Sequence, residues 1–257
     1  MNDERTLFRT EGLSIQFGAL KAVNGMSLTI EKDKFTTILG PNGAGKTTFF
    51  NLLSGLLLPT EGKLFFKGKD ITNFTPQQRI NEGIGRSFQL TNVFPMLTAH
   101  ENVRLAAQSA LKVGYKLFKD HRSYAEVNER TDMLLERVLL KDKRHFRASD
   151  LSHGEQRKLE LAMVLALEPE VLLLDEPTAG MSVEEVPVMI ELLQGIKKSG
   201  TTILLVEHKM NMVKALSDVL VIMCNGELLC QGDPESVSND PEVMRAYLGG
   251  GMVNVTA

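Results

Sequence analysis

The chain has 257 residues, enough for one large domain or for one domain with a sizeable subdomain, and its 43% of hydrophobic residues predicts a buried core. Its net charge of −3 argues against a dedicated nucleic-acid-binding protein, because neutralising phosphates requires a clear cationic excess. The longest stretches without Asp, Glu, Lys or Arg, residues 47–60 and 87–100, are shorter than the roughly 20 apolar residues of a membrane-spanning helix.

The N-terminal part of the chain is rich in strand-like sequence. Short apolar runs predict strands at residues 7–10, 13–17, 26–30, 35–39 and 63–67. Asn24-Gly25 and Glu61-Gly62 punctuate these runs with turn residues, so we expect an antiparallel β region here. The first ten residues are polar and acidic, which is unlike a secretory signal.

A phosphate-binding pattern, GxxxxGK[ST], follows the apolar run 35–39 directly. It consists of Gly40, Pro41, Asn42, Gly43, Ala44, Gly45, Lys46 and Thr47, with Thr48 next. Glycines let a backbone wrap closely around phosphates, and amide groups at a helix N-terminus favour negative charge. We expect Lys46 to reach the β- and γ-phosphates and Thr47 to ligate Mg²⁺. A Gly-rich turn without a ligand is the alternative, which the strand–loop–helix context disfavours.

The middle of the chain is predicted to be helical, from Ala99 to about Arg147. The polar segment Leu-Ser-His-Gly-Glu-Gln at 151–156 then leads into a helix expected at 156–167. A serine and free amides at a helix N-terminus form a second anion site. Two such helix starts in one chain suggest composite sites that two subunits complete for each other.

Strands and helices alternate after residue 150. We expect strands at 171–174 and 201–206 and helices at 186–198 and 210–216, which predicts a parallel sheet covered on both faces. The first of these strands delivers Asp175 and Glu176 at the sheet edge where ligands bind. We expect Asp175 to hold Mg²⁺ and Glu176 to activate the attacking water as general base. Together with the phosphate loop, these acids predict nucleoside triphosphate hydrolysis.

The two cysteines flank a predicted hairpin turn at Asn225-Gly226. A two-residue turn places Cys224 opposite Glu227 and Cys230 opposite Val221, so the thiols are not partners. Buried free thiols suit a reducing compartment. We therefore expect a cytoplasmic chain.

Taken in order, these motifs resemble those of the ATP-binding cassette (ABC) ATPases over essentially the whole chain. Residues 40–48 match the Walker A motif, 151–156 the signature motif and 171–176 the Walker B motif. The resemblance implies that Phe17 stacks on adenine, that Gln89 ligates Mg²⁺ and relays nucleotide state to a membrane partner, and that His208 contacts the γ-phosphate. It also implies that Ser152 and Gly154 reach the γ-phosphate held by the opposite subunit.

The implied fold is α/β: a P-loop NTPase core with a mostly parallel sheet, an N-terminal antiparallel β subdomain and an inserted α-helical subdomain. We expect one ABC ATPase domain over residues 1–257. The RecA-like core and β subdomain would take about 1–89 and 166–257, the helical subdomain about 90–165, and a C-terminal tail about 240–257. The implied cofactors are ATP and Mg²⁺.

Finer sequence features resemble the branched-chain amino acid and urea/amide importers, and in particular the longer of their two ATPase subunits. Three of the segments that show this resemblance are residues 83–89, 151–157 and 175–182. His153 and Glu155 depart from the usual Gly and Gln of the signature, and Ser182 stands where many relatives have Asp. An importer of branched-chain amino acids is favoured over one for urea or short amides. An exporter, a lipopolysaccharide-transport ATPase and a soluble ABC protein of DNA repair or translation are less favoured.

The implied partners follow from this resemblance. They are a second ATPase subunit, identical or different, two polytopic permease subunits and, indirectly, a periplasmic solute-binding protein, with no nucleic acid. The chain would then lie peripherally on the inner face of the cell membrane.

Overall fold

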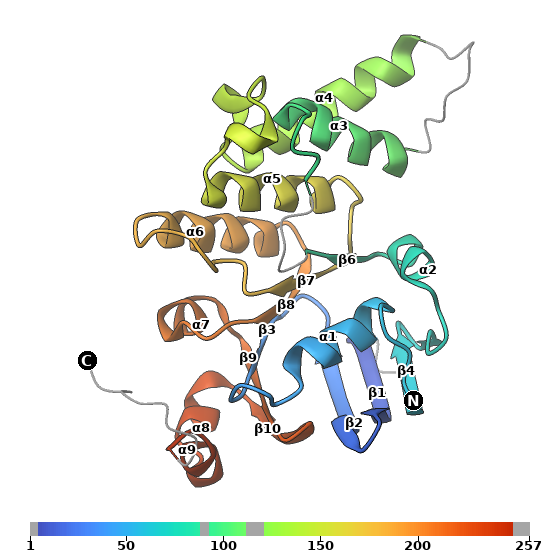
Figure 1. Ribbon diagram of the computed structural model, residues 1–257, viewed down its shortest axis with the longest axis vertical. Coiled ribbons are helices and arrows are strands. Elements are labelled where there is room, and N and C mark those ends of the chain that lie inside the picture. The colour runs from blue at the N-terminus through green and yellow to red at the C-terminus, as the bar shows by residue number, and fades with distance from the viewer. Residues whose placement is uncertain (1–4, 88–92, 112–120, 249–257) are drawn as a thin grey trace.

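The computed structural model describes residues 5–87, 93–111 and 121–248, and its strands and helices stack in layers (Figure 1). The first layer is an antiparallel sheet of order β2-β1-β4-β5. Its strands are β1 (Thr6–Phe17), β2 (Leu20–Glu31), β4 (Glu61–Phe66) and β5 (Lys69–Asp70).

The strand β1 is continuous where two strands were predicted. Its pairing with β2 shifts register between Thr10 and Leu13, around Gly12, whose φ of 57° is left-handed. The Gly12 amide donates to the hydroxyl of Ser27 in β2 (2.8 Å). A bulge therefore carries the strand through residues 11–12, which lie between the two predicted strands 7–10 and 13–17.

The central sheet has six strands in the order β10-β9-β3-β8-β7-β6, and it is parallel except for the edge pair β9–β10. The strands are β3 (Phe35–Leu39), β6 (Ile84–Arg86), β7 (Val171–Asp175), β8 (Thr202–Val206), β9 (Val219–Cys224) and β10 (Glu227–Gly232). The predicted α/β class, with a mostly parallel sheet and an antiparallel N-terminal part, is confirmed. The division into a core at about 1–89 and 166–257 and a helical part at 90–165 stays a prediction.

Helices lie against the sheets or on one another (Figure 1). They are α1 (Lys46–Ser54), α2 (Pro76–Asn81), α3 (Ala99–Ala110), α4 (His121–Arg137), α5 (His153–Leu165), α6 (Glu185–Lys198), α7 (Met210–Leu216), α8 (Pro234–Ser238) and α9 (Pro241–Leu248), with 3₁₀ turns η1 (Lys141–Lys143) and η2 (Ala148–Asp150). The helix α5 starts three residues before its predicted start, because Ser152 and Glu155 form a capping box: each side chain accepts a hydrogen bond from the other residue's backbone amide.

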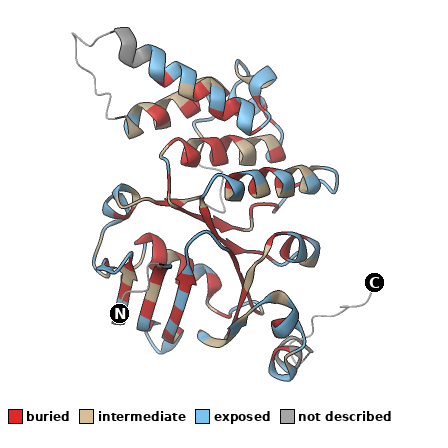
Figure 2. Cartoon of the chain, turned by 180° about the vertical axis from the view of Figure 1, so that it is seen from behind, coloured by how far each residue is buried: buried red, intermediate tan, exposed pale blue. Residues whose placement is uncertain are grey.

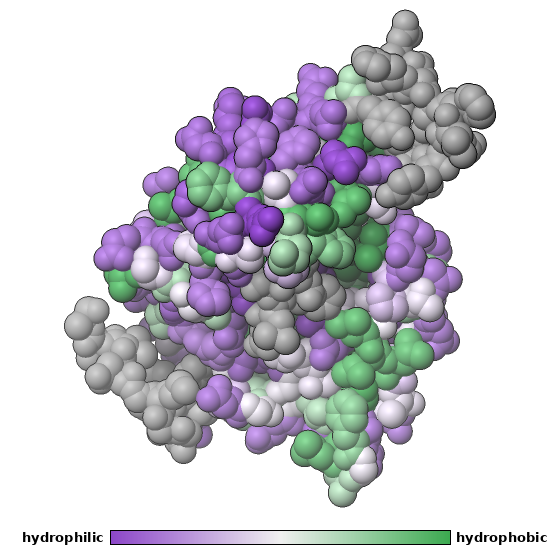
Figure 3. All heavy atoms as spheres, turned by 45° about the horizontal axis from the view of Figure 1, so that its top comes forward, coloured by the Kyte–Doolittle hydropathy of each residue, from purple (hydrophilic) through white to green (hydrophobic). Residues whose placement is uncertain are grey.

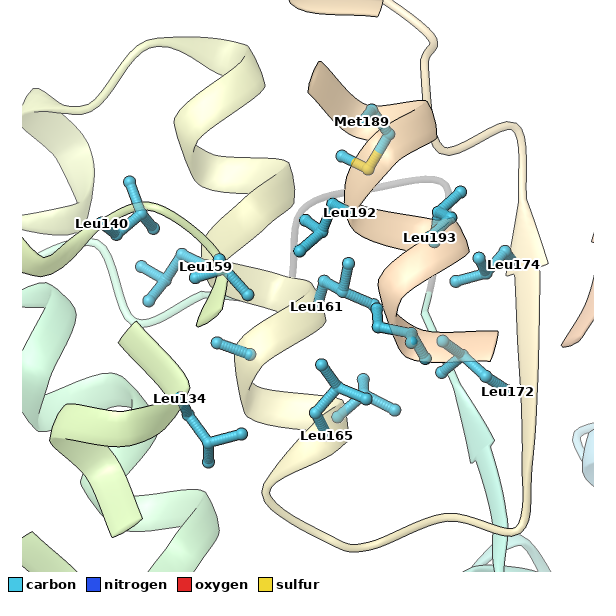
Figure 4. Close-up of a cluster of buried hydrophobic side chains, with 14 of the residues drawn as sticks. Leu134, Leu140, Leu159, Leu161, Leu165, Leu172, Leu174, Met189, Leu192 and Leu193 are labelled. Carbon is cyan, nitrogen blue, oxygen red and sulfur yellow. The ribbon is translucent and has the colours of Figure 1, made fainter. Parts of the chain in front are cut away.

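Two hydrophobic cores lie on opposite faces of the central sheet. In β7, Leu172 and Leu174 join the core that includes α3 to α6, whereas Val171 and Leu173 join the core shared with α1 and the antiparallel sheet. Figure 2 shows the central strands buried along their length, and Figure 4 shows Leu172 and Leu174 among the leucines of α5 and α6. Because successive side chains point to opposite faces, a strand buried on both sides reads as an unbroken apolar run.

The C-terminal hairpin corrects one prediction. Cys224 lies opposite Glu227 as expected, but Cys230 lies opposite Ile222 rather than Val221, because the register shifts between Leu228 and Cys230. Both thiols are free, and they are half-buried rather than buried. Within the described residues, the structure contains no helix long and apolar enough to cross a bilayer.

Candidate active site

The phosphate loop joins the C-terminal end of β3 to the N-terminus of α1. Gly43 and Gly45 have left-handed φ angles of 80° and 92°. A Cβ atom on Gly45 would also collide with the backbone carbonyl oxygen of Ala22 in β2. The loop can therefore pack this closely against the antiparallel sheet only with glycine at position 45.

Lys46 is the first residue of α1, and its side chain lies within the loop. Its Nζ donates hydrogen bonds to the carbonyl oxygens of Gly40 (2.7 Å) and Pro41 (2.9 Å). Burial lowers the pKa of the Lys46 ammonium, and the charges of Glu176 and Asp175 oppose that shift. The lysine is thus within electrostatic range of both predicted acids, as a phosphate-binding cation in this site requires.

Asp175 ends β7 with both carboxylate oxygens buried and, within the described residues, without a hydrogen-bond partner. Arg86 Nη2 lies 3.9 Å from Asp175 Oδ2. Burial is the main cause that raises the pKa of Asp175, while the charge of Arg86 acts to lower it. The side chain is buried and close to the charge of Arg86, yet neither oxygen accepts a hydrogen bond within the described residues.

These oxygens fit a hard divalent cation, which prefers carboxylate and hydroxyl ligands. Thr47 is exposed and lines the same cavity as Lys46. Across the described ranges, no cluster of three or more His, Cys, Asp or Glu side chains could hold a metal ion by itself. Asp175 and Thr47 therefore suit an ion that arrives with phosphate oxygens as its other ligands.

Glu176 and His208 meet at the mouth of the site. His208 Nε2 lies 2.9 Å from Glu176 Oε1, and both side chains are about one-third exposed, at 38% and 31%. Glu176 has a left-handed φ of 49°, which is rare for a residue with a side chain, and its amide donates to the Val206 carbonyl oxygen (2.9 Å). Backbone strain of this kind persists only where the surroundings enforce it, and it is common at active sites.

A cavity of about 570 Å³, a volume typical of ligand sites, brings together Lys46, Glu176 and His208. Asp175, buried at the end of β7, is not among its lining residues. The residues that line the cavity are Leu20, Lys21, Ala22, Asn42, Gly43, Ala44, Gly45, Lys46, Thr47, Thr48, Glu176, His208 and Asn225. The phosphate loop thus shares one cavity with Glu176, the predicted general base, and with His208, the predicted contact of the γ-phosphate.

Comparison with known proteins identifies the family. Residues 23–179 match the family described as "ABC transporter", and residues 227–252 match the "Branched-chain amino acid ATP-binding cassette transporter" family. The high-affinity branched-chain amino acid transport ATP-binding protein LivG of Salmonella typhimurium is 38% identical over 249 residues, covering 95% of this chain and 98% of LivG. BraF of Pseudomonas aeruginosa, which carries the same description, is 36% identical over 251 residues, covering 95% and 98% of the two chains.

The chain belongs to the ABC transporter family. It is an ABC ATPase, and nucleotide is its ligand. Solved structures agree with this assignment. A nucleotide-free ATP-binding cassette from an ABC transporter superposes with a TM-score of 0.82 at 29% identity, covering 94% of this chain and 98% of that one. An ATP-binding cassette in its ADP conformation gives 0.82 at 30% identity, with 95% and 99% covered.

Two predicted contacts of this ABC ATPase lie away from the cavity. Ser152 and Gly154 begin α5 and are not among the cavity's lining residues. Ser152 Oγ instead lies 3.4 Å from Glu185 Oε1, and a Cβ atom on Gly154 would collide with the same carboxylate. Their assignment to the opposite subunit's nucleotide stays a prediction.

Phe17 is not among the residues that line the cavity, and its stacking on adenine stays a prediction. Phe17 is 49% exposed and pairs with Leu20 across the tight turn between β1 and β2, but only Leu20 lines the cavity. Asn225, in the β9–β10 turn, lines it as well. The Asn-Gly turn was visible in sequence, but its position beside β2 was not, because it depends on contacts such as the hydrogen bond from the Asn24 amide to the Gly226 carbonyl oxygen (2.8 Å). Gln89 lies outside the described residues.

Proposed function

We propose that this chain is the ATP-hydrolysing subunit of an importer for branched-chain amino acids. The observation that carries the proposal is its similarity, over nearly the full length of both chains, to LivG and BraF, whose names describe branched-chain amino acid transport. The match of residues 227–252 to the branched-chain amino acid cassette family supports the same solute class.

Hydrolysis would proceed within the cavity described above. The amides of the phosphate loop and the ammonium of Lys46 bind the β- and γ-phosphates. Glu176 Oε1 accepts a proton from the attacking water, and His208 Nε2, which lies 2.9 Å from that oxygen, holds the water and the γ-phosphate in line. Thr47, Asp175 and Gln89 would hold Mg²⁺, which when bound neutralises charge on the phosphates.

Two such subunits would close over two nucleotides. In this arrangement Lys46 and Glu176 of one subunit face Ser152 and Gly154 of the other. Ser152 and Gly154 do not line the cavity of their own chain, which supports a site shared between two subunits. The second subunit is a related ATPase, for which we favour a different chain over a second copy.

The permease subunits would meet the chain near residues 88–92, at the helical subdomain that we place at about 90–165. Large hydrophobic side chains are exposed beside this segment, with Phe94 at 52% and Met96 at 69%. Leu58, in the turn after α1, is also exposed, at 52%. The end of α1 lies close to the end of β6, since Arg86 Nη1 donates a hydrogen bond to Ser54 Oγ (2.6 Å). On one face of the molecule, hydrophobic side chains gather in patches among hydrophilic ones (Figure 3). These contacts would keep the chain at the cytoplasmic face of the membrane, and a solute-binding protein would deliver solute outside.

The proposal is tested by uptake in cells that lack this chain. We expect loss of radiolabelled leucine uptake, restored by the wild-type chain but not by Glu176→Gln, which removes the general base and retains ATP. Urea uptake serves as the control. Loss of urea uptake in place of leucine uptake contradicts the solute class, and normal uptake of both solutes contradicts the transport role.

Purification from native membranes in mild detergent tests the assembly. We expect this chain to co-purify with two polytopic subunits and a second ATPase, which mass spectrometry would identify. Recovery with ribosomes or DNA would instead contradict the membrane assembly.

A further inference from the structure

Glu207 is a buried carboxylate to which the proposed hydrolysis gives no role. It follows β8, directly precedes His208, and is only 3% exposed. Burying a carboxylate is costly unless hydrogen bonds replace its hydration, and an apolar side chain would fill the same space without that cost. The contacts of Glu207 therefore indicate what the charge does.

Each oxygen of Glu207 accepts hydrogen bonds from a different segment. Oε1 accepts from the hydroxyl of Thr178, a fully buried residue two positions after Glu176. Oε2 accepts from the backbone amides of His208 (2.6 Å) and Lys209 (3.3 Å). One side chain thus joins the segment that carries His208 to the loop that follows Glu176.

A second contact strengthens the same connection. Lys209 Nζ donates to the carbonyl oxygen of Thr178 (3.1 Å), so Thr178 is held at its hydroxyl and at its carbonyl by the two residues that flank His208. Hydrogen bonds to an ionised carboxylate are about twice as strong as those between neutral groups. The backbone of His208 is therefore anchored to the loop after Glu176 independently of the His208–Glu176 contact.

We propose that Glu207 is a positioning residue for ATP hydrolysis, which fixes the backbone of His208 relative to Thr178 so that the imidazole stays within hydrogen-bond distance of Glu176. This inference rests on the proposed roles of Glu176 and His208. Glu207 acts through His208 and is not among the residues that line the cavity. Its loss should lower kcat and leave nucleotide affinity unchanged, because the phosphate loop is built by other residues.

The test measures single-turnover hydrolysis and the Kd for ATP in three variants. Thr178→Val removes one donor at nearly constant shape, and we expect kcat to fall about 10-fold. Glu207→Ala removes the whole connection, and the loss should approach about 100-fold, which is the effect of misplacing a catalytic group by roughly 1 Å. Glu207→Gln can still accept from the two amides and donate to the Thr178 hydroxyl, so it should recover most of the rate.

A matched control is Thr131→Val, because the Thr131 hydroxyl is also fully buried and donates to the Val127 carbonyl oxygen (2.7 Å) within α4. We expect it to leave kcat and Kd unchanged. In a His208→Ala background, Thr178→Val should cause no further loss of rate, since a positioning residue has no effect once the residue that it positions is absent.

The outcomes separate this inference from the proposed function. If Glu176→Gln and His208→Ala retain the wild-type rate, the proposed hydrolytic site is wrong. If those two variants lose activity but Thr178→Val and Glu207→Ala keep the wild-type rate, only the role of Glu207 is wrong. A 10-fold loss from Thr178→Val that persists in the His208→Ala background also overturns it. Should Glu207→Ala fail to fold, Thr178→Val still decides the question.

Discussion

Replacing Asp175 with asparagine should make the nucleotide-free protein more stable and the hydrolytic site inactive. The carboxylate is 1% exposed, its oxygens have no hydrogen-bond partner within the described residues, and Arg86 lies 3.9 Å away. Asparagine keeps the shape and removes the charge. Active-site groups of this kind commonly reduce stability for the sake of function.

The size of the effect follows from the buried charge. An unsatisfied buried polar group costs about 1–3 kcal/mol, and we take about 1 kcal/mol because the asparagine amide also lacks partners. For a chain of this length, that free energy raises Tm by about 2–4 °C. With Mg·ADP at about 100 times its Kd, the wild type should gain about 2.7 kcal/mol and overtake the variant, which has lost a ligand of the ion.

The pH dependence of stability also tests whether Asp175→Asn is more stable than the wild type. Burial raises the pKa of Asp175 above its ordinary value of 3.8, so the folded chain holds this proton more tightly than the unfolded chain does. The wild type therefore gains stability relative to Asp175→Asn as pH falls through the raised pKa, and loses it as pH rises. Thermal unfolding in EDTA between pH 4 and pH 8 measures the difference. A variant less stable than the wild type at pH 8 would refute the reasoning.

Three further substitutions test the site and its support. Lys46→Ala should weaken ATP binding at least about 10-fold, since a charged hydrogen bond contributes about 1.5–3 kcal/mol, and an unchanged Kd by calorimetry would exclude the loop as phosphate site. Gly45→Ala should lower Tm more than Gly43→Ala, because only the former Cβ meets the Ala22 carbonyl; equal losses would contradict the packing described for the loop. Arg79→Met should lower the free energy of unfolding by about 3–5 kcal/mol in urea titration, because buried carbonyl oxygens lose their hydrogen-bond donor. The buried guanidinium, whose pKa burial lowers to about 10, donates to the carbonyl oxygens of Leu52, Leu53, Thr72 and Phe74. A change below about 1 kcal/mol would show that this cap at the end of α1 contributes little.

Local patterns predicted most of the core elements. The strands β3 and β7 were found from unbroken apolar runs, and α7 was predicted with its observed bounds. Errors arose where one residue changes the pairing. Strands were predicted at 7–10 and 13–17, but a bulge at Gly12 joins them into one strand. The register shift before Cys230 moved its partner from Val221 to Ile222. A bulge depends on the partner strand, so the sequence of one strand does not reveal it.

What the sequence by itself determined is the chemistry that short segments carry: a phosphate loop at Gly40–Lys46 and two acids at the end of a buried strand. These follow from backbone geometry and residue type over a few neighbouring positions. Only the tertiary structure decided which distant groups meet, such as Asn225 beside the phosphate loop and the Glu207 carboxylate on Thr178. Such contacts join residues that are far apart in the chain, and packing of the sheet and its helices, rather than local preference, brings them together.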